Sequence, residues 1–283
     1  MSVPRGKRLP RLIRAALERA GIDDAGRAAT GVDVIGDIAI VRLGGFGPRE
    51  KTKSAEALLS ELKNVRVVME QEGGIEGEYR LRKLKRLAGE KRTLTVHKEN
   101  GCTFRVDVAK CYFSPRLSTE RLRVADQVKP KERVLNMFAG VGPFSVLIAK
   151  RTGADVESCE LNAYAAELHR ENNRLNKVER LVSVINADAV DLPELTRSKF
   201  DRILMPHPSE ADRFLPTALR MAKKGAHIHY YRHVLGRDDA EGAGRLREEL
   251  SELLPLRTRY TVRRIREVGP RWLEMLAEIR VAS

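Results

Sequence analysis

The chain has 283 residues, of which 33% are charged and 5% aromatic, and its formal net charge is +14. This length suits two modest domains, or one large domain with an addition, and no apolar run approaches the ~18 residues of a membrane span. Residues 1–19 contain no continuous apolar segment of the kind found in secretory signals, so we expect a cytoplasmic protein. The positive charge favours a polyphosphate partner, although a basic proteome or a thermophile's surface would produce the same excess.

The first half of the chain predicts a small α+β domain. Residues 11–20 form the first expected helix, which Gly21 ends, and a β-rich run begins at Val32. The elements expected after this run are a helix over 55–62, a strand over 65–69, a loop at Gly73, Gly74 and Gly77, and a hairpin of strands 93–97 and 103–108.

From Glu132 onward, strands and helices alternate, which predicts a parallel, doubly wound sheet. The expected strands are 133–138, 155–160, 181–186, 201–204 and 226–231, and the expected helices are 143–150, 163–173, 216–221 and 243–253. Residues 260–268 and 273–281 meet at Gly269-Pro270 and predict an antiparallel hairpin at the sheet edge.

This layout is typical of a class I methyltransferase, so the predicted fold class is α/β, with a Rossmann-like domain beside a smaller α+β domain. We predict three regions: a helical extension over 1–31, a small α+β RNA-binding and active-site domain over 32–115, and a class I methyltransferase domain over 116–283. Cys102, Cys111 and Cys159 form no Cys-x-x-Cys pair, and no histidine stands at metal-ligand spacing from them. We therefore expect reduced, buried thiols and no structural metal.

A glycine loop follows the first strand of the expected sheet. In Ala139-Gly140-Val141-Gly142, the glycines let a ligand approach the backbone, and Pro143 suits the first turn of the helix that follows. A dinucleotide site would require a third glycine near the place where Phe144 and Ser145 stand. The loop therefore favours S-adenosylmethionine, which carries no pyrophosphate, over NAD.

Two acidic residues end the strands that follow this loop. Glu160 stands about 20 residues after the glycines, where a carboxylate can accept both ribose hydroxyl protons, and the alternative is a solvent-exposed strand-end acid. Asp188 ends the third strand, where it would face the adenine amino group, although a helix or turn cap explains it nearly as well. The other residues predicted to contact the cofactor are Phe138, Asn162 and Pro208.

Seven motifs carry a resemblance to a known family. They are Asp33-Val-Ile-Gly-Asp-Ile-Ala-Ile40, Gly77-Glu-Tyr-Arg80, Glu99-Asn-Gly101, Tyr112-Phe-Ser-Pro-Arg-Leu-Ser-Thr-Glu-Arg121, Asn136-Met-Phe-Ala-Gly-Val-Gly-Pro-Phe144, the run from Asn173 to Lys177, and His229-Tyr-Tyr231. With them the chain resembles the archaeal and eukaryotic tRNA guanine-N1 methyltransferases, which modify the purine 3′-adjacent to the anticodon. Related wybutosine enzymes, which transfer an aminocarboxypropyl group, usually replace the Pro115-Arg116-Leu117 part, so these residues favour the methyltransferase.

The resemblance implies roles for the residues of these motifs. Glu120 would be the base that removes the guanine N1 proton, Arg80 would stabilise O6, and Tyr112 would position the substrate. A carboxylate in a partly desolvated pocket is a better base, and a guanidinium supplies fixed donors to a developing oxyanion. Without the family, Glu120 would be interpreted as a surface ion pair with Arg121 or Arg123.

The resemblance also implies how RNA binds. The partner would be the anticodon stem-loop of tRNA, with its backbone held by Arg116 and Arg121, and no obligatory protein partner is expected. The alternative for Arg80 is that it belongs to a basic run, itself a candidate phosphate-binding face, made of Arg80, Arg82, Lys83, Lys85 and Arg86.

Two features depart from the family pattern. Only about thirty residues precede Val32, too few for the extra N-terminal domain of many members, so we expect the short archaeal form. The fourth strand usually ends in Asn-Leu-Pro, but here Met205-Pro206-His207-Pro208 stands there, and Pro206 cannot make the hydrogen bonds of that Asn. His207 either takes over base recognition or is a loop residue without a role.

Three activities therefore remain to be compared. The first is methyl transfer to guanine N1 of the nucleotide at tRNA position thirty-seven. The second is a wyosine-pathway reaction, either aminocarboxypropyl transfer or C-methylation of the tricyclic base. The third is a non-catalytic RNA-binding relic, against which the intact Gly140, Gly142, Glu160 and Glu120 argue.

Overall fold

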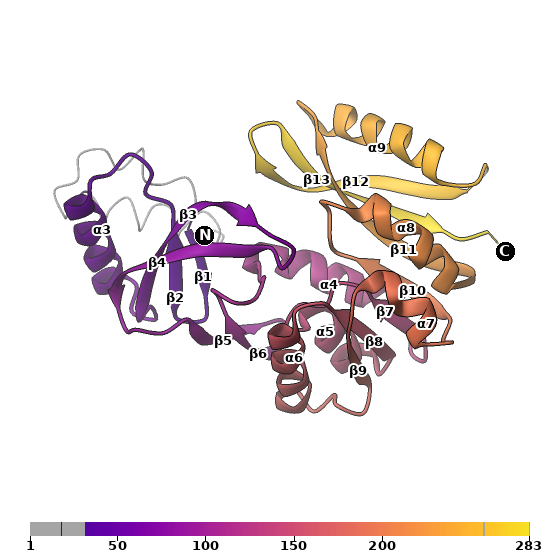
Figure 1. Ribbon diagram of the computed structural model, residues 1–283, viewed down its shortest axis with the longest axis horizontal. Coiled ribbons are helices and arrows are strands. Elements are labelled where there is room, and N and C mark those ends of the chain that lie inside the picture. The colour runs from indigo at the N-terminus through magenta and orange to yellow at the C-terminus, as the bar shows by residue number, and fades with distance from the viewer. Residues whose placement is uncertain (1–17, 19–31, 257, 283) are drawn as a thin grey trace, which may run out of the picture. The chain divides into compact units, whose positions relative to one another are not determined.

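The computed structural model describes residue 18, residues 32–256 and residues 258–282, and the helix expected over 11–20 lies, apart from Glu18, outside them. The chain divides into two compact units, Met1–Ser118 and Thr119–Ser283 (Figure 1). Among the described residues, no helix is long and apolar enough to cross a membrane. The three cysteines are buried.

The first unit contains a four-stranded sheet and a separate hairpin. The sheet has the order β1-β2-β3-β4, and α3 connects the parallel strands β2 and β3 and packs Ala55 and Leu58 against the sheet. Asn100 and Gly101 turn the hairpin with positive φ angles, as a two-residue turn requires. The elements are β1 Val32–Ile35, β2 Ile38–Val41, α3 Pro48–Glu61, β3 Val67–Glu76, β4 Leu81–Gly89, β5 Leu94–Glu99 and β6 Cys102–Asp107.

Two predictions for the first unit were wrong. Gly73 and Gly74 lie within β3, where the register shifts between Gln71 and Ile75, and only Gly77 of the three lies in a turn, directly after the strand. Apart from Arg80, the basic run lies in the edge strand β4, and Arg82 is not part of a phosphate-binding face, because it is buried and pairs with Asp33. The basic residues of this strand that are exposed are Lys83, Lys85 and Arg86.

The second unit is built on a seven-stranded sheet of order β12-β13-β11-β10-β7-β8-β9. β13 pairs antiparallel with both β11 and β12, so the predicted hairpin at the edge of a parallel sheet is confirmed. The strands are β7 Arg133–Asn136, β8 Asp155–Glu160, β9 Val182–Asn186, β10 Phe200–Met205, β11 Ala222–Leu235, β12 Arg259–Gly269 and β13 Trp272–Arg280. The helices are α4 Ser118–Gln127, α5 Pro143–Thr152, α6 Ala163–Leu175, α7 Leu192–Leu195, α8 Ala211–Met221 and α9 Asp239–Leu253, with a 3-10 turn at Ala189–Asp191. A further 3-10 turn, Pro115–Leu117, belongs to the first unit and precedes α4.

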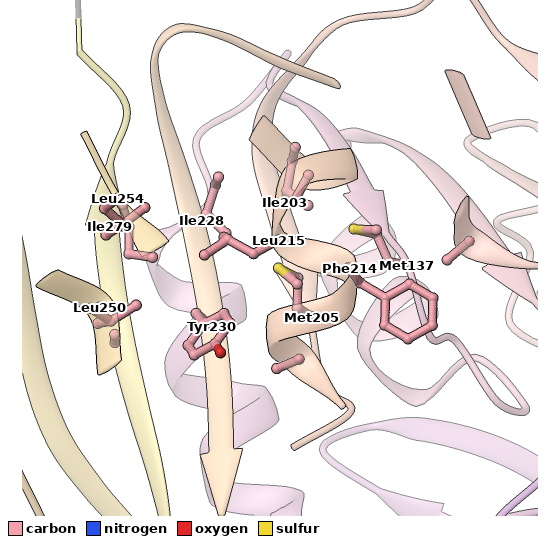
Figure 2. Close-up of a cluster of buried hydrophobic side chains, with 14 of the residues drawn as sticks. Met137, Ile203, Met205, Phe214, Leu215, Ile228, Tyr230, Leu250, Leu254 and Ile279 are labelled. Atoms are coloured by element: carbon pink, nitrogen blue, oxygen red, sulfur yellow. The ribbon is translucent and has the colours of Figure 1, made fainter. Parts of the chain in front are cut away.

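The main core lies between this sheet and helices α7, α8 and α9. Alternate residues of β11, Ile228 and Tyr230, point into it together with Phe214 and Leu250 from the helices (Figure 2). α8 begins at Ala211, although a helix start had been expected at Pro216, because its buried apolar side extends over the whole helix. The residues of β11 between those of the core, His229 and Tyr231, face the other side of the sheet.

Replacing Tyr230 by Phe is expected to lower the free energy of unfolding by about 1–2 kcal/mol. Its hydroxyl donates to Glu249 Oε1 at 2.6 Å, and the substitution removes this one bond while it keeps the ring in the core. Urea unfolding monitored by circular dichroism measures the change. An unchanged unfolding midpoint would show that the bond contributes nothing to stability.

Candidate active site

The glycine loop lies at the carboxyl end of β7, where the strand order of the sheet reverses between β8 and β10. Such reversal points bind ligands in open α/β sheets. Gly140 and Gly142 have φ angles of 55° and 88°, a backbone conformation that side chains disfavour. Pro143 occupies the first turn of α5, as the sequence predicts.

Gly142 is also required by what packs beneath it. A Cβ atom there would lie 2.2 Å from Cδ2 of His169 on α6. Burial lowers the pKa of His169 to about 3, and neither ring nitrogen has a hydrogen-bond partner among the described residues, so this histidine is a neutral packing group. One turn further along α6, Asn172 Nδ2 donates to the carbonyl oxygen of Val141 at 2.9 Å. Helix α6 therefore fixes the loop from below.

Glu160, at the carboxyl end of β8, fastens the loop to its neighbouring strand. Its Oε2 accepts from the Gly140 N–H at 2.6 Å, and its Oε1 accepts from the Asn162 N–H at 2.9 Å. Burial raises the pKa of Glu160, and hydrogen bonds from the backbone N–H groups of Asn162, Gly140 and Leu161 oppose this rise. Glu160 is half-buried and bonded to the glycine loop, so it is not the solvent-exposed strand-end acid of the alternative interpretation. Its contact with a ribose stays a prediction.

Asn162 and Asp188 both cap helical segments. The Asn162 side chain accepts from the N–H groups of Tyr164 and Ala165 at the start of α6. Asp188 accepts from the Val190 N–H, and its other oxygen lies 3.6 Å from Arg213. The contacts of Asp188 are thus those of a helix cap. Its half-buried carboxylate lies at the carboxyl end of β9, where the sequence analysis expects the adenine amino group.

The segment that replaces Asn-Leu-Pro lies beside the glycine loop. The His207 ring is 4.9 Å from that of Phe138, which in turn lies 4.8 Å from Phe214. Pro208 is buried, and its carbonyl oxygen accepts from the His233 N–H at 3.0 Å. Of the predicted contacts, Phe138, His207 and Pro208 therefore belong to the same end of the sheet as Gly140.

Glu120 lies on α4 with 6% of its surface exposed. Its partner is Arg123, whose Nε and Nη2 donate to the two carboxylate oxygens at 2.8 and 2.7 Å, and the Tyr231 hydroxyl donates to Oε1 at 2.7 Å. The ion-pair interpretation had the right partner, but the pair is buried. The Tyr231 ring lies 6.4 Å from that of Phe144, which directly follows Pro143, so Glu120 is close to the glycine loop.

The first unit brings Arg80 and Tyr112 together. The Arg80 guanidinium lies over the Tyr112 ring at 5.2 Å, and Arg80 has a φ angle of 54°. Asp33 binds both Arg82 and Arg116, with its oxygens 3.0 and 2.7 Å from their nitrogens. Burial opposes the ionisation of Asp33, but the charges of these arginines outweigh it and lower the pKa of the carboxyl group.

The two arginines predicted to hold the RNA backbone differ in exposure. The Arg116 side chain is 46% exposed, so a phosphate can reach it. Arg121 is only 2% exposed, and in this structure its guanidinium is not accessible to a phosphate. Its position on the inner side of α4 accounts for this difference, because Val124 and Ala125 of that helix are buried as well.

Sequence reasoning gave no role to two residues that shape the site, His169 and Tyr231, and it named a third, Arg123, only in the ion-pair alternative for Glu120. His169 supports the glycine loop, and Arg123 and Tyr231 hold Glu120. Tyr231 lies in the motif His229-Tyr-Tyr231, and the alternation of β11 could have placed it opposite the core. For His169, the only available signal was its position on the apolar side of α6, which the structure buries with Ala165, Ala166 and Leu168.

The sheet order, with an antiparallel strand inserted next to the edge, and the glycine loop after the first strand define a Rossmann-like domain of the class I methyltransferase type. The comparisons with known proteins agree. Residues 95–248 match the TRM5/TYW2 methyltransferase domain, and residues 15–93 match the TYW2 N-terminal domain. The chain belongs to the TRM5/TYW2 family, as the resemblance predicted.

Relatives include enzymes with two activities. The chain is 43% identical over 206 residues to the tRNA (guanine(37)-N(1))-methyltransferase Trm5b of Pyrococcus abyssi, which covers 71% of this chain and 59% of that protein. It is 35% identical over 251 residues to the tRNA 4-demethylwyosine(37)-methyltransferase Taw21 of Saccharolobus solfataricus, and the match covers 88% of this chain and 93% of that protein. A solved complex of aTrm5 with tRNALeu has a TM-score of 0.84 at 30% identity and covers 95% of this chain and 78% of that one.

Proposed function

We propose that this chain transfers the methyl group of S-adenosylmethionine to N1 of the guanosine 3′-adjacent to the anticodon, at tRNA position thirty-seven. One observation carries the proposal: Glu120, the only acid in the Tyr112–Arg121 motif, is held by Tyr231, which lies beside the helix that follows the glycine loop. A proton acceptor and a cofactor loop thus share one end of one domain. The similarity to Trm5b supports the same activity. The proposed compartment is the cytoplasm.

The residues present suit the proposed cofactor. A carboxylate has four acceptor positions, and Glu160 uses two for the backbone N–H groups of Gly140 and Asn162, which leaves room for a ribose hydroxyl. Gly140 and Gly142 keep side chains away from the loop, and Phe138 offers an aromatic surface nearby. When bound, S-adenosylmethionine supplies a methyl group on a cationic sulfonium.

The proposed acid–base chemistry belongs to three side chains. Guanine N1 carries a proton, so it becomes a good nucleophile only after Glu120 has accepted that proton. Negative charge then develops on O6, where the Arg80 guanidinium would donate hydrogen bonds. Tyr112, stacked against Arg80, would hold that guanidinium in place. Arg116 is the proposed contact to the RNA backbone, and His207 is the proposed contact to the target base.

The test of the proposed function is product identification. The protein is incubated with an unmodified tRNA transcript and methyl-labelled S-adenosylmethionine, and the digested nucleosides are analysed by mass spectrometry. N1-methylguanosine at the nucleotide 3′-adjacent to the anticodon is the expected product. If calorimetry detects no binding of S-adenosylmethionine and no label reaches the tRNA, the chain is an RNA-binding relic.

A specific observation favours a second candidate, C-methylation of 4-demethylwyosine at the same nucleotide. The Taw21 relative is covered over 93% of its length, and Pro206 stands where the guanine-N1 enzymes of the family usually carry Asn. A proline has no side-chain donor or acceptor to offer a guanine edge. Incubation with tRNA that already carries 4-demethylwyosine decides between the two, because only the second activity labels this base at carbon.

Binding of tRNA is expected to weaken steeply with rising salt, because the chain carries a net charge of +14 and exposes Lys83, Lys85 and Arg86 on β4. The logarithm of the affinity should fall linearly with the logarithm of the salt concentration, and Lys85→Ala should reduce the slope by about one. The control is Lys129→Ala, at the opposite end of β7 from the glycine loop. A flat salt titration would exclude electrostatic docking.

A further inference from the structure

The carboxylate of Glu120 has almost no acceptor capacity left. Oε1 accepts from Tyr231 Oη at 2.7 Å and from Arg123 Nη2 at 2.7 Å, while Oε2 accepts from Arg123 Nε at 2.8 Å. A carboxylate oxygen has two lone pairs, so both positions on Oε1 are used and one on Oε2 remains. An incoming proton therefore has one site to occupy without displacing a donor.

Arg123 is itself held in place by a second carboxylate. Its Nη1 donates to Glu278 Oε1 on β13 at 2.7 Å, and Gln127, one turn further along α4, donates to the same oxygen at 3.0 Å. Burial opposes the ionisation of Glu278, but the hydrogen bonds from Arg123 and Gln127 outweigh it and lower the pKa of this carboxyl group. Glu278 thus fixes one side of the guanidinium while Glu120 occupies the other.

His229 on β11 lies beside Glu278 without a hydrogen bond to it. Its Nε2 lies 2.8 Å from Arg202 Nη1, and because a guanidinium only donates, this nitrogen must be the acceptor. The ring proton then resides on Nδ1, which lies 3.6 Å from Glu278 Oε1. Burial lowers the pKa of His229 well below its usual range, in agreement with a neutral ring. The hydrogen bonds that hold Arg123 therefore run from α4 to Glu278 on β13.

We propose that Tyr231 and Arg123 are positioning residues that orient Glu120 so that Oε2 receives the proton of the target base. This inference rests on the proposed function and specifies its proton transfer. The N1–H bond breaks, the proton goes to Oε2, and the electron pair stays on N1 to form the bond to the methyl carbon. Glu278 acts one contact further away, because it holds Arg123.

Both donors bind the carboxylate that would take up the proton, so the proposal can be tested by the pH dependence of the rate. The charged and titratable groups that face the Tyr231–Glu120 contact within the second unit are Arg123 on α4 and Glu274 on β13. Burial, followed by the charge of Glu120, raises the pKa of Tyr231 well above its usual value, so its hydroxyl remains a donor. Removing that hydroxyl takes away one of the three hydrogen bonds to the Glu120 carboxylate, so the pH dependence of the rate should change.

The test compares Tyr231→Phe with Tyr230→Phe. Each substitution deletes one buried hydroxyl bonded to a glutamate, but Tyr230 contacts Glu249 on the opposite side of the sheet. Single-turnover methyl transfer should fall about tenfold to a hundredfold in Tyr231→Phe, the range of one hydrogen bond to a charged group. The pH profile of the rate should differ from that of the native protein. Tyr230→Phe should keep the native rate and pH profile.

A double mutant separates positioning from a general loss of structure. In the Glu120→Gln background, Tyr231→Phe should cost little further rate, because its effect acts through the carboxylate. Full multiplicative losses in the double mutant, or a native rate and pH profile in Tyr231→Phe, would overturn the proposal. Thermal unfolding of each variant shows whether it is folded.

A second measurement does not depend on the reaction. The carboxyl carbon of Glu120, assigned by its absence in Glu120→Gln, is titrated by NMR in the native protein and in Tyr231→Phe. A changed midpoint in Tyr231→Phe supports the positioning role even if no N1-methylguanosine forms, a result that would reject only the proposed function. Identical midpoints would reject the positioning role even if the methyl transfer is as proposed.

Discussion

Glu120→Gln is expected to lower the single-turnover rate of methyl transfer by about 10²–10⁴-fold, the usual contribution of a general base. Glutamine keeps the shape of the side chain and still accepts from Arg123 or Tyr231 through its carbonyl oxygen, but it cannot take a proton from guanine N1. The affinities for cofactor and tRNA should barely change, because the residue acts mainly in the transition state. The native rate should rise with pH until the base is ionised.

The control for this variant is Glu249→Gln, which also removes the charge of a glutamate bonded to a β11 tyrosine, on the other side of the sheet. It should keep the native rate once the fraction of folded protein is accounted for. Near-native single-turnover transfer in Glu120→Gln would remove Glu120 from the acid–base step. His207, beside Phe138, would then be the next residue to replace.

Glu160→Ala is expected to weaken binding of S-adenosylmethionine by about 1.5–3 kcal/mol, the scale of hydrogen bonds to a charged group. The variant removes the proposed acceptor for the ribose and also releases the Gly140 N–H that Glu160 holds at 2.6 Å. Both effects reduce affinity, and isothermal calorimetry measures their sum. Glu160→Gln separates them, because it retains one acceptor oxygen and loses the charge.

The matched control is Glu157→Ala, which deletes another partly buried acid of β8. Burial raises the pKa of Glu157, and this residue lies three positions before Glu160, away from the carboxyl end of the strand. Its removal should leave cofactor affinity at the native value. Equal losses in the two variants would attribute the effect to the strand, and an unchanged affinity in Glu160→Ala would exclude this residue from the cofactor site.

Local patterns were sufficient to predict much of the second unit. The strand expected over 155–160 coincides with β8, and the helix expected from residue 163 begins there, because Asn162 caps it and apolar residues recur at helical spacing. The glycines that end β7 also fixed the place of the predicted cofactor loop. These elements are encoded by neighbouring residues, so a single sequence reveals them.

Some elements were not predicted, either because their polar side chains bond to partners far away in the sequence or because charged residues give no helical spacing of apolar residues. β4 was interpreted as a basic run because nothing near Arg82 in sequence indicates that Asp33, 49 residues away, neutralises it. α3 begins at Pro48, seven positions before the expected start, since its first turns carry charged side chains without apolar periodicity. α4, which carries Glu120, was not predicted at all.

The surroundings of Glu120 were beyond prediction for the same reason. Tyr231 and Glu120 are separated by 111 residues, and Arg123 and Glu278 by 155. The family resemblance supplied the importance of Glu120, but the number of donors to its carboxylate depends on which strands lie next to α4. Only the packing of α4 against β11 and β13 shows that Oε2 retains an acceptor position.

The insertion of β13 between β11 and β12 has a consequence for synthesis on the ribosome. β13 pairs with two strands that both emerge before it, so the edge of β11 stays open until Trp272–Arg280 has been translated. Glu278 arrives with this strand, and before then Arg123 has Glu120 but not Glu278 as a partner. The nascent chain therefore exposes an aggregation-prone edge and lacks the Arg123–Glu278 bond over the same interval, and one docking event ends both conditions.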